Sequence, residues 1–147
     1  MNEELKEIFK VCDTMFENTT IDFKELLSKQ IDVDFFEDYT NTRLVNSFLF
    51  NFSKLQDKIG AKLFRKVLYE LKEIDDINMP MIDILNRLEK LSIIEDIRKW
   101  DELREIRNSI AHEYPFEINE RVENIKLAMV GFEMLEGMYN KLKVSSI

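Results

Sequence analysis

The chain is poor in the residues that interrupt helices and in those that form cross-links or bind metals. Its 147 residues include three glycines, two prolines, one cysteine and one histidine. A single cysteine, Cys12, excludes an internal disulfide and a cysteine-based metal site, and it indicates a reducing compartment. Because tight turns need glycine and proline, the sequence favours a few long helices over many short strands.

The chain also lacks an excess of basic residues and a long apolar run. Asp and Glu number 29 against 21 Lys and Arg, so the net charge is −8. This acidity argues against non-specific coating of nucleic acid but still allows a local basic site. No segment has the apolar length of a membrane span, and Met1–Lys6 is acidic where a signal peptide would be basic and then apolar. We therefore expect one soluble, cytoplasmic domain over residues 1–147, with no membrane partner.

Apolar residues that recur three and four positions apart predict several amphipathic helices. The pattern covers residues 3–17, with a restart toward residue 30 that leaves one kinked helix or two open, and then residues 40–73, 81–91 and 119–143. Residues 31–39 and 74–79 are expected connections, and Pro80 is the expected first residue of the next helix. Gly60 falls inside the longest stretch, where we expect it to permit close approach of another helix.

One further helix is predicted to begin after Ser92 and to end at Pro115. Ser92 and Glu95 have the spacing of a capping box, and the apolar face then runs from Ile93 to Ile110. The final helix is apolar over so much of its surface that we expect it to be central in the bundle or shared with a second subunit. The predicted fold is all-α: an antiparallel up-and-down bundle of four long helices with shorter pieces, forming a dimer.

The only histidine, His112, stands in a short polar run at the end of this helix. The run reads Arg-Asn-Ser-Ile-Ala-His-Glu-Tyr from Arg107 to Tyr114, and Pro115 follows. Asn108 and His112 are four residues apart, so a helix places them on one face, with Arg107 one step round. The group therefore lies at a helix exit, because proline cannot continue the helix.

These residue types suit phosphate chemistry without a metal or another cofactor. Arg107 offers a planar fork for phosphoryl oxygens, and His112 can take or give a proton near neutral pH. Asn108 can fix the imidazole tautomer or orient a hydroxyl. Arg104 is the expected substrate contact within a set of basic residues near the motif in sequence: Arg98, Lys99, Arg104, Arg107 and Arg121. Since RNA cleavage needs an acid and a base, two copies meeting across a two-fold axis would supply both.

The motif resembles the signature of the HEPN family, in its HepT toxin branch. The matching residues are Arg107, His112 after four intervening residues, and Tyr114 after one more, with the polar Asn108 following the arginine. Residues 54–64 and 100–115 also look like stretches of HepT-like chains. The resemblance runs from the second long helix to the end of the chain, and residues 1–39 carry no recognisable match.

The resemblance implies a specific activity and a specific partner. HEPN proteins are all-α homodimers, and many are metal-independent ribonucleases in which Arg and His of both subunits line one cleft. By this resemblance Arg107, Asn108 and His112 are the catalytic residues, and the substrate is RNA (tRNA or mRNA). HepT-like toxins are neutralised by an MNT-type nucleotidyltransferase antitoxin that adds AMP to the motif tyrosine, here Tyr114. Such a bulky anion would exclude RNA by size and charge.

Two alternatives remain open from the residues. In the first, the protein is a non-catalytic module that binds a nucleotide or substrate for a separate nucleotidyltransferase. In the second, it is an inert helical interaction protein, and Arg107 only pairs with a carboxylate such as Glu102, Glu105 or Glu113.

Overall fold

The computed structural model describes residues 2–111 and 117–146, and this part of the chain is helical without a β-strand. The elements are α1 (Glu3–Leu27), the 3₁₀ turn η1 (Phe35–Glu37), α2 (Tyr39–Lys58), the π-helical turn η2 (Ile59–Leu63), α3 (Phe64–Glu70), α4 (Met81–Lys90), α5 (Ile97–Ala111) and α6 (Ile118–Ser145). The all-α prediction is confirmed for the described residues.

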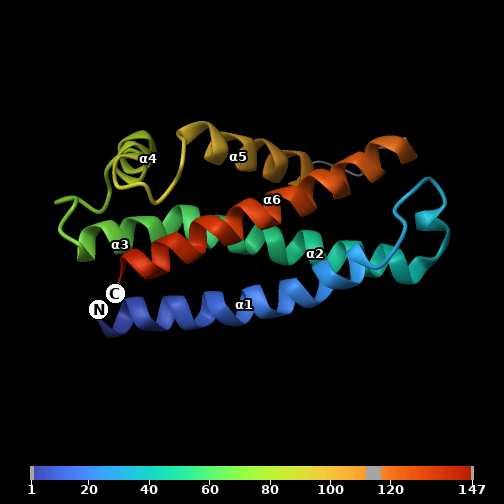
Figure 1. The fold of residues 1–147 in the computed structure, drawn as a ribbon, viewed down its shortest axis with the longest axis horizontal. Helices are drawn as coiled ribbons and strands as arrows, with labels where there is room; N and C mark the ends of the chain where they lie inside the picture. Colours follow the sequence, from blue (N-terminus) through green and yellow to red (C-terminus); the bar gives the residue numbers. More distant parts are fainter. Residues whose placement is uncertain (1, 112–116, 147) are drawn as a thin grey trace.

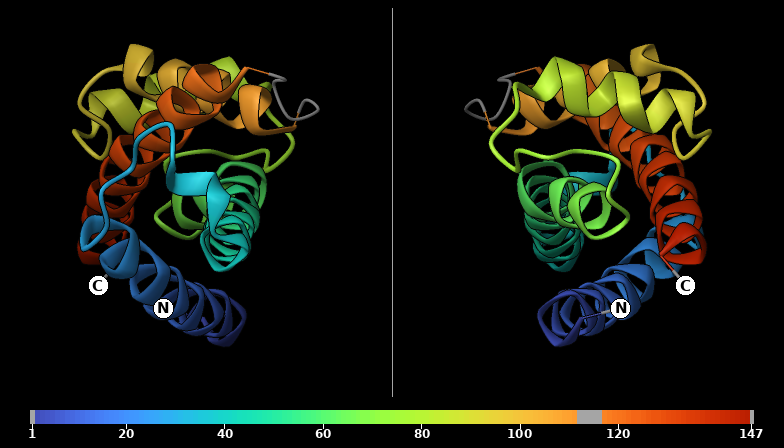
Figure 2. Two further views of the ribbon diagram at one scale, coloured as in Figure 1. Left: turned by 90° about the vertical axis from the view of Figure 1, so that its right-hand side faces the viewer. Right: turned by 90° about the vertical axis from the view of Figure 1, so that its left-hand side faces the viewer.

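The long helices alternate in direction, as an up-and-down bundle requires (Figure 1). Helix α1 runs one way, α2 with η2 and α3 returns as one continuous rod, and α5 and α6 repeat the pattern. The short α4 crosses the others, and end-on views show the helices surrounding a shared core (Figure 2). Helix α1 begins and α6 ends at the same end of the bundle (Figure 1).

Helix α1 is one uninterrupted helix whose buried residues repeat every seven positions. Its buried side chains are Leu5, Phe9, Cys12, Phe16, Thr19, Phe23 and Leu26, which alternate steps of four and three as in a coiled coil. The restart that the sequence left open after residue 17 does not occur. Within the uninterrupted helix, the Thr19 hydroxyl donates to the Met15 carbonyl oxygen at 2.6 Å. Asn2 caps its start by accepting from the Leu5 amide at 2.8 Å.

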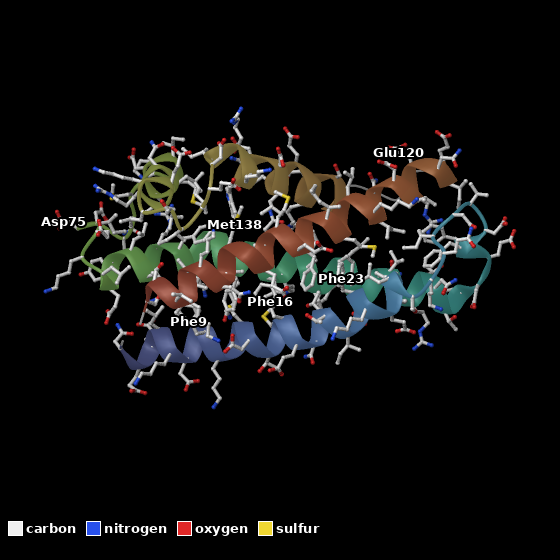
Figure 3. All side chains as sticks on the ribbon, viewed as in Figure 1. Phe9, Phe16, Phe23, Asp75, Glu120 and Met138 are labelled. Carbon is white, nitrogen blue, oxygen red and sulfur yellow. The ribbon has the colours of Figure 1, made fainter. Side chains whose placement is uncertain are left out.

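The phenylalanines of α1 form an aromatic seam against α6. Phe9, Phe16 and Phe23 point from α1 toward α6 (Figure 3). The Phe16 ring lies 4.6 Å from Tyr139, and the Phe23 ring lies 5.1 Å from Phe132. Ring pairs at these distances add specific contacts to the burial of apolar area, so this seam holds the two termini of the chain together.

The helix predicted over residues 40–73 contains a π-helical turn instead of a regular α-helical path. Residues 59–63 form this turn, and Gly60 lies in it. A Cβ built on Gly60 would come within 2.6 Å of Trp100 Cζ2 on α5. The expectation that Gly60 permits close approach of another helix is therefore confirmed.

Three local predictions before α5 are wrong. Ser92 does not begin the helix, because it adopts a left-handed backbone (φ 60°), and α5 starts five residues later at Ile97. The cap is Asp96, whose carboxylate accepts from the Arg98 amide at 2.8 Å. Pro80 lies just before α4 instead of being its first helical residue. The amphipathic pattern placed the helices well but their starts poorly.

Candidate functional site

The motif residues that the structure describes lie on the last part of α5. Arg107 and Asn108 belong to this helix, which packs against α6 on one side and contacts α2 and α4 on the other. Arg104 lies one turn earlier. His112 and Tyr114 lie outside the described residues, so the spacing argument for them stands as a prediction. This segment forms an amphipathic helix because Trp100, Leu103 and Ile106 recur three residues apart and face the core.

Arg107 is held by a carboxylate from another helix. Its Nε and Nη2 atoms donate to the two carboxylate oxygens of Asp57, on α2, at 3.1 and 3.0 Å. Arg107 thus pairs with a carboxylate, as the alternative of an inert interaction protein has it, but the partner is Asp57 on another helix; Glu113 lies outside the described residues. The hydrogen bonds from Arg107 to Asp57 raise the pKa of the guanidinium above its ordinary value, against the smaller opposing effect of burial. Arg107 therefore stays charged, with a defined orientation.

A hollow of about 560 Å³ lies beside this ion pair. Its walls come from the end of α2, the π-helical turn, α3, the start of α4, and α5. The residues that line it are Gln56, Asp57, Gly60, Ala61, Arg65, Met81, Trp100, Arg104, Arg107 and Asn108. The structure thus brings Arg104, Arg107 and Asn108, all predicted site residues, to one concave surface of ligand size.

Gln56 is the least expected member of this hollow. Its side chain is only 3 % exposed, and its Oε1 atom is buried without a hydrogen-bond partner among the described residues. Buried side-chain acceptors are normally paired, because leaving one unpaired costs about 1–3 kcal/mol. Gln56 thus lines the hollow, while its side-chain oxygen is buried in the protein.

The other basic residues of the predicted set do not form one continuous positive surface. Arg98 donates to Asp96 at 2.6 Å, and Arg104 makes a looser contact with Asp101 at 3.6 Å. Arg121 lies elsewhere, with its guanidinium carbon 3.8 Å from the centre of the Phe36 ring. Arg65, which does line the hollow, donates to the carbonyl oxygens of Ile77 and Met79. The cationic side chains at the hollow are thus Arg65, Arg104 and Arg107, and Asp57 offsets part of their charge.

A second concave surface lies between α5 and α6. It is a groove of about 330 Å³ with apolar side chains from both helices, among them Ile106, Ile110, Leu127, Val130 and Met134. Leu127 and Val130 are 45 % and 57 % exposed, although both are large and apolar. Since Ile106 adjoins Arg107 in sequence, the groove and the hollow share the same segment of α5.

Within residues 2–111 and 117–146, no three His, Cys, Asp or Glu side chains gather closely enough to bind a metal ion. In the same residues no helix has the length and apolarity needed to cross a membrane. The buried Cys12 thiol has its pKa raised to about 11, first by burial, which makes it a poor nucleophile or metal ligand.

Sequence reasoning missed Asp57 and Gln56, the two residues of α2 that face the motif. Both stand inside residues 54–64, one of the two stretches on which the family resemblance rests. A hydrophilic pair near the end of an amphipathic helix is ordinary on a solvated surface, so composition alone gives no reason to select them. The one available signal was Gly60, because a close helix approach there brings neighbouring residues against α5.

Comparisons with known proteins find no match for this chain among family models, curated proteins or solved structures. The resemblance to the HEPN family therefore rests on the motif residues and their spacing.

Proposed function

We propose that this protein is a metal-independent endoribonuclease toxin of the HepT type. The observation that carries the proposal is that Arg107, Asn108 and Arg104 line one hollow at the end of the helix that leads into His112. Two cationic side chains and an amide suit a phosphodiester, and the adjacent histidine suits proton transfer. Asp57 orients Arg107 by a two-point contact, which leaves the Nη1 atom of the guanidinium available for a phosphoryl oxygen.

In the proposed reaction the 2′-hydroxyl of RNA attacks the neighbouring phosphorus. His112 accepts the hydroxyl proton while the O2′–P bond forms, and the P–O5′ bond breaks. A second copy of His112 gives a proton to the leaving 5′-oxygen, so the products are a 2′,3′-cyclic phosphate and a 5′-hydroxyl. Arg107 and Arg104 neutralise the charge that develops on the phosphoryl oxygens.

The second copy of His112 comes from a homodimer formed through the α5–α6 groove. Exposed Leu127 and Val130 give this groove the apolar character of an interface core, and it shares α5 with the hollow. Leu127→Glu together with Val130→Glu should convert the dimer to a monomer and abolish RNA cleavage. Size-exclusion chromatography with light scattering measures the mass in solution and so shows whether the variant is a monomer.

The proposed partner is an MNT-type nucleotidyltransferase that inactivates the toxin at Tyr114. In that step the Tyr114 hydroxyl attacks the α-phosphorus of ATP, an Oη–P bond forms, and pyrophosphate leaves. The resulting anion next to His112 would repel RNA phosphates. Co-expression with such an enzyme should add one AMP unit to the wild-type chain and none to Tyr114→Phe, as measured by intact mass.

The deciding experiment is RNA cleavage by purified protein in the presence of EDTA. Wild-type protein should cut tRNA or mRNA to ends with a 2′,3′-cyclic phosphate, and His112→Ala should be slower by about 10²–10⁴-fold. Arg107→Ala should also lose activity. Arg98→Ala is the matched control, because Arg98 is on the same helix but pairs with Asp96 away from the hollow. RNA that stays intact from about pH 6 to pH 8 would contradict the proposal.

One observation favours a non-catalytic binding module as the second candidate. Each arginine at the hollow contacts a protein oxygen: Arg107 contacts Asp57, Arg104 contacts Asp101, and Arg65 contacts two backbone carbonyls. Such a site can bind a nucleotide without cleaving RNA. Expression of the wild type beside His112→Ala separates the two, because only a ribonuclease arrests growth in a histidine-dependent way.

A further inference from the structure

The rod formed by α2, η2 and α3 is basic, although the protein as a whole is acidic. Residues 39–70 contain six Lys and Arg and two acidic residues, Asp57 and Glu70, whereas the whole chain has 21 basic and 29 acidic residues. Helix α2 lies at the outside of the bundle between α1 and α5 (Figure 2). A basic stretch in an otherwise acidic protein indicates an anionic partner at this surface.

The exposed basic side chains of this rod are not neutralised by the fold. Arg43, Lys54 and Lys62 are exposed, and none of them forms an ion pair with a described residue. By contrast, Lys66 lies farther along the rod and contacts Glu4 at 2.6 Å. The charges nearest the outer face of α2 therefore remain available to a ligand.

An exposed aromatic ring lies on the same face of α2. Phe50 is 62 % exposed, and the Lys54 ammonium nitrogen lies 5.2 Å from the centre of its ring. Arg43, Phe50 and Asp57 are seven residues apart, nearly two helical turns, so they share one face of the helix. Because Asp57 contacts Arg107 at the hollow, this face leads from the hollow to the ring over about 10 Å of helix.

We propose that this face of α2 binds single-stranded RNA that extends out of the hollow, with one unpaired base stacked on Phe50 and backbone phosphates at Lys54 and Arg43. The inference rests on the proposed function and adds a second contact region for its substrate. Only an unpaired base can stack on a protein ring, so the surface selects single strands over duplexes.

The geometry of the face fits such a strand. At a spacing of about 3.4 Å for each stacked nucleotide, the 10 Å of helix between Asp57 and Phe50 correspond to about three nucleotides. The contact between Lys54 and the Phe50 ring is exposed to solvent and weak, so an incoming base can displace it. The displaced ammonium group then stays close to the phosphate of that base.

The direct test is the binding of a strand that a ribonuclease cannot cut. A fluorescently labelled 2′-O-methyl oligonucleotide of about ten nucleotides has no free 2′-hydroxyl, and fluorescence anisotropy measures its affinity. Phe50→Leu keeps an apolar side chain but removes the ring, and it should weaken binding by about fivefold or more. Lys54→Gln and Arg43→Gln should each weaken binding and lower the slope of log affinity against log salt by about 0.7.

The same rod supplies a matched control for each type of change. Tyr69→Leu removes another exposed ring, 52 % exposed, at the far end of the rod. Lys66→Gln removes the same charge from a side chain that already pairs with Glu4. Both controls should bind the oligonucleotide as the wild type does. Thermal melts should show the wild-type melting temperature for Phe50→Leu and Lys54→Gln, because both side chains are exposed.

Several results would overturn the inference. Wild-type affinity in Phe50→Leu would do so, as would an equal loss in Tyr69→Leu or equal affinity for a duplex of the same sequence. No binding of the oligonucleotide by the wild type would also overturn it and would favour an acidic protein as the partner of this surface. The proposed function fails separately: binding that depends on Phe50, without cleavage of unmodified RNA, would keep this surface and refute the ribonuclease.

Discussion

Two helix contacts of this bundle, α1 with α6 and α2 with α5, differ in regularity. We infer that the first contributes stability and the second a binding surface. The α1–α6 seam is regular: phenylalanines seven residues apart pack on Phe132 and Tyr139. The α2–α5 contact is irregular, with a π-helical turn, a glycine against Trp100, a hollow and an unpaired buried amide oxygen. π-helical turns frequently occur at functional sites, because an inserted residue changes which side chains face the neighbouring helix.

The polar groups of the two regions differ in the same way. Asp13 on α1 accepts from Lys143 at 2.7 Å and from the Tyr139 hydroxyl at 2.6 Å, and the hydroxyl also lies 3.0 Å from the Phe9 carbonyl oxygen. The carboxylate, the ammonium group and the hydroxyl of this network are thus paired with one another. At the hollow, Arg107 donates to Asp57 through Nε and Nη2, and the buried Gln56 oxygen has no hydrogen-bond partner among the described residues. The contrast supports stability as the role of the first seam and binding as the role of the second.

The largest expected loss of stability comes from breaking the regular seam. Phe132 is 1 % exposed and contacts Phe16, Phe23 and Phe48. Phe132→Ala should lower the free energy of unfolding by about 3–5 kcal/mol, because it leaves a cavity among these rings. Denaturant unfolding measures the change. Phe50→Ala is the control, since Phe50 is 62 % exposed, and an equal loss in both variants would contradict the comparison.

The next largest effect comes from adding one methyl group at the irregular seam. Gly60→Ala places a Cβ 2.6 Å from Trp100, so the α2–α5 contact must shift, and we expect a loss of about 1–3 kcal/mol. Gly137→Ala, on α6, meets no atom within 4 Å and should instead be stabilising by up to about 1 kcal/mol. Thermal melts show whether each substitution raises or lowers the melting temperature. Stabilisation by Gly60→Ala would mean that the close approach is not a constraint.

A smaller effect is expected when acid opens the Asp13 network. Burial alone would raise the pKa of Asp13, but hydrogen bonds from Lys143 and Tyr139 together outweigh it and hold the pKa below the ordinary value of 3.8. A carboxyl whose folded pKa is lowered stabilises the fold above its unfolded pKa and loses that contribution as the pH falls through the folded value. The loss should therefore occur below about pH 4.

Asp13→Asn isolates this contribution. The variant should be less stable than the wild type at neutral pH, and the difference should shrink as the pH falls below about 4. Unfolding by urea at a series of pH values checks this prediction. A difference that stays constant down to the acid limit would show that Asp13 acts through packing and not through its charge.

The smallest effect on stability is expected at the ion pair of the candidate site. The Asp57 side chain is 56 % exposed, so Asp57→Asn should change the free energy of unfolding by less than about 1 kcal/mol. It should still lower kcat/KM for RNA on the order of tenfold, because Arg107 loses its fixed orientation. Asp101→Asn, at the looser contact with Arg104, is the control. An unchanged kcat/KM in Asp57→Asn would show that Asp57 does not orient Arg107 for the reaction.

Periodicity predicted the regular parts of this structure and missed the irregular ones. The apolar spacing over residues 3–17 predicted an amphipathic helix, and α1 contains it, with its buried face continuing through Phe23. The helix after Ser92 was predicted to begin too early, because a capping-box pattern does not show whether the backbone turns left-handed at Ser92. Arg107 and Asn108 of the motif line one hollow together with Arg104 of the nearby basic set, while His112 and Tyr114 lie outside the described residues, so the role of these residues stays a prediction.

The sequence by itself determined the helices, their buried faces and the polar motif at the end of α5, because these depend on spacing within one segment. Tertiary structure alone decided that Asp57 contacts Arg107 across 50 positions and that Gln56 lines the same hollow. Both depend on how far α2 is rotated and shifted against α5. The close contact between Gly60 and Trp100 fixes this rotation and shift. It cannot be predicted from the spacing of apolar residues within either helix.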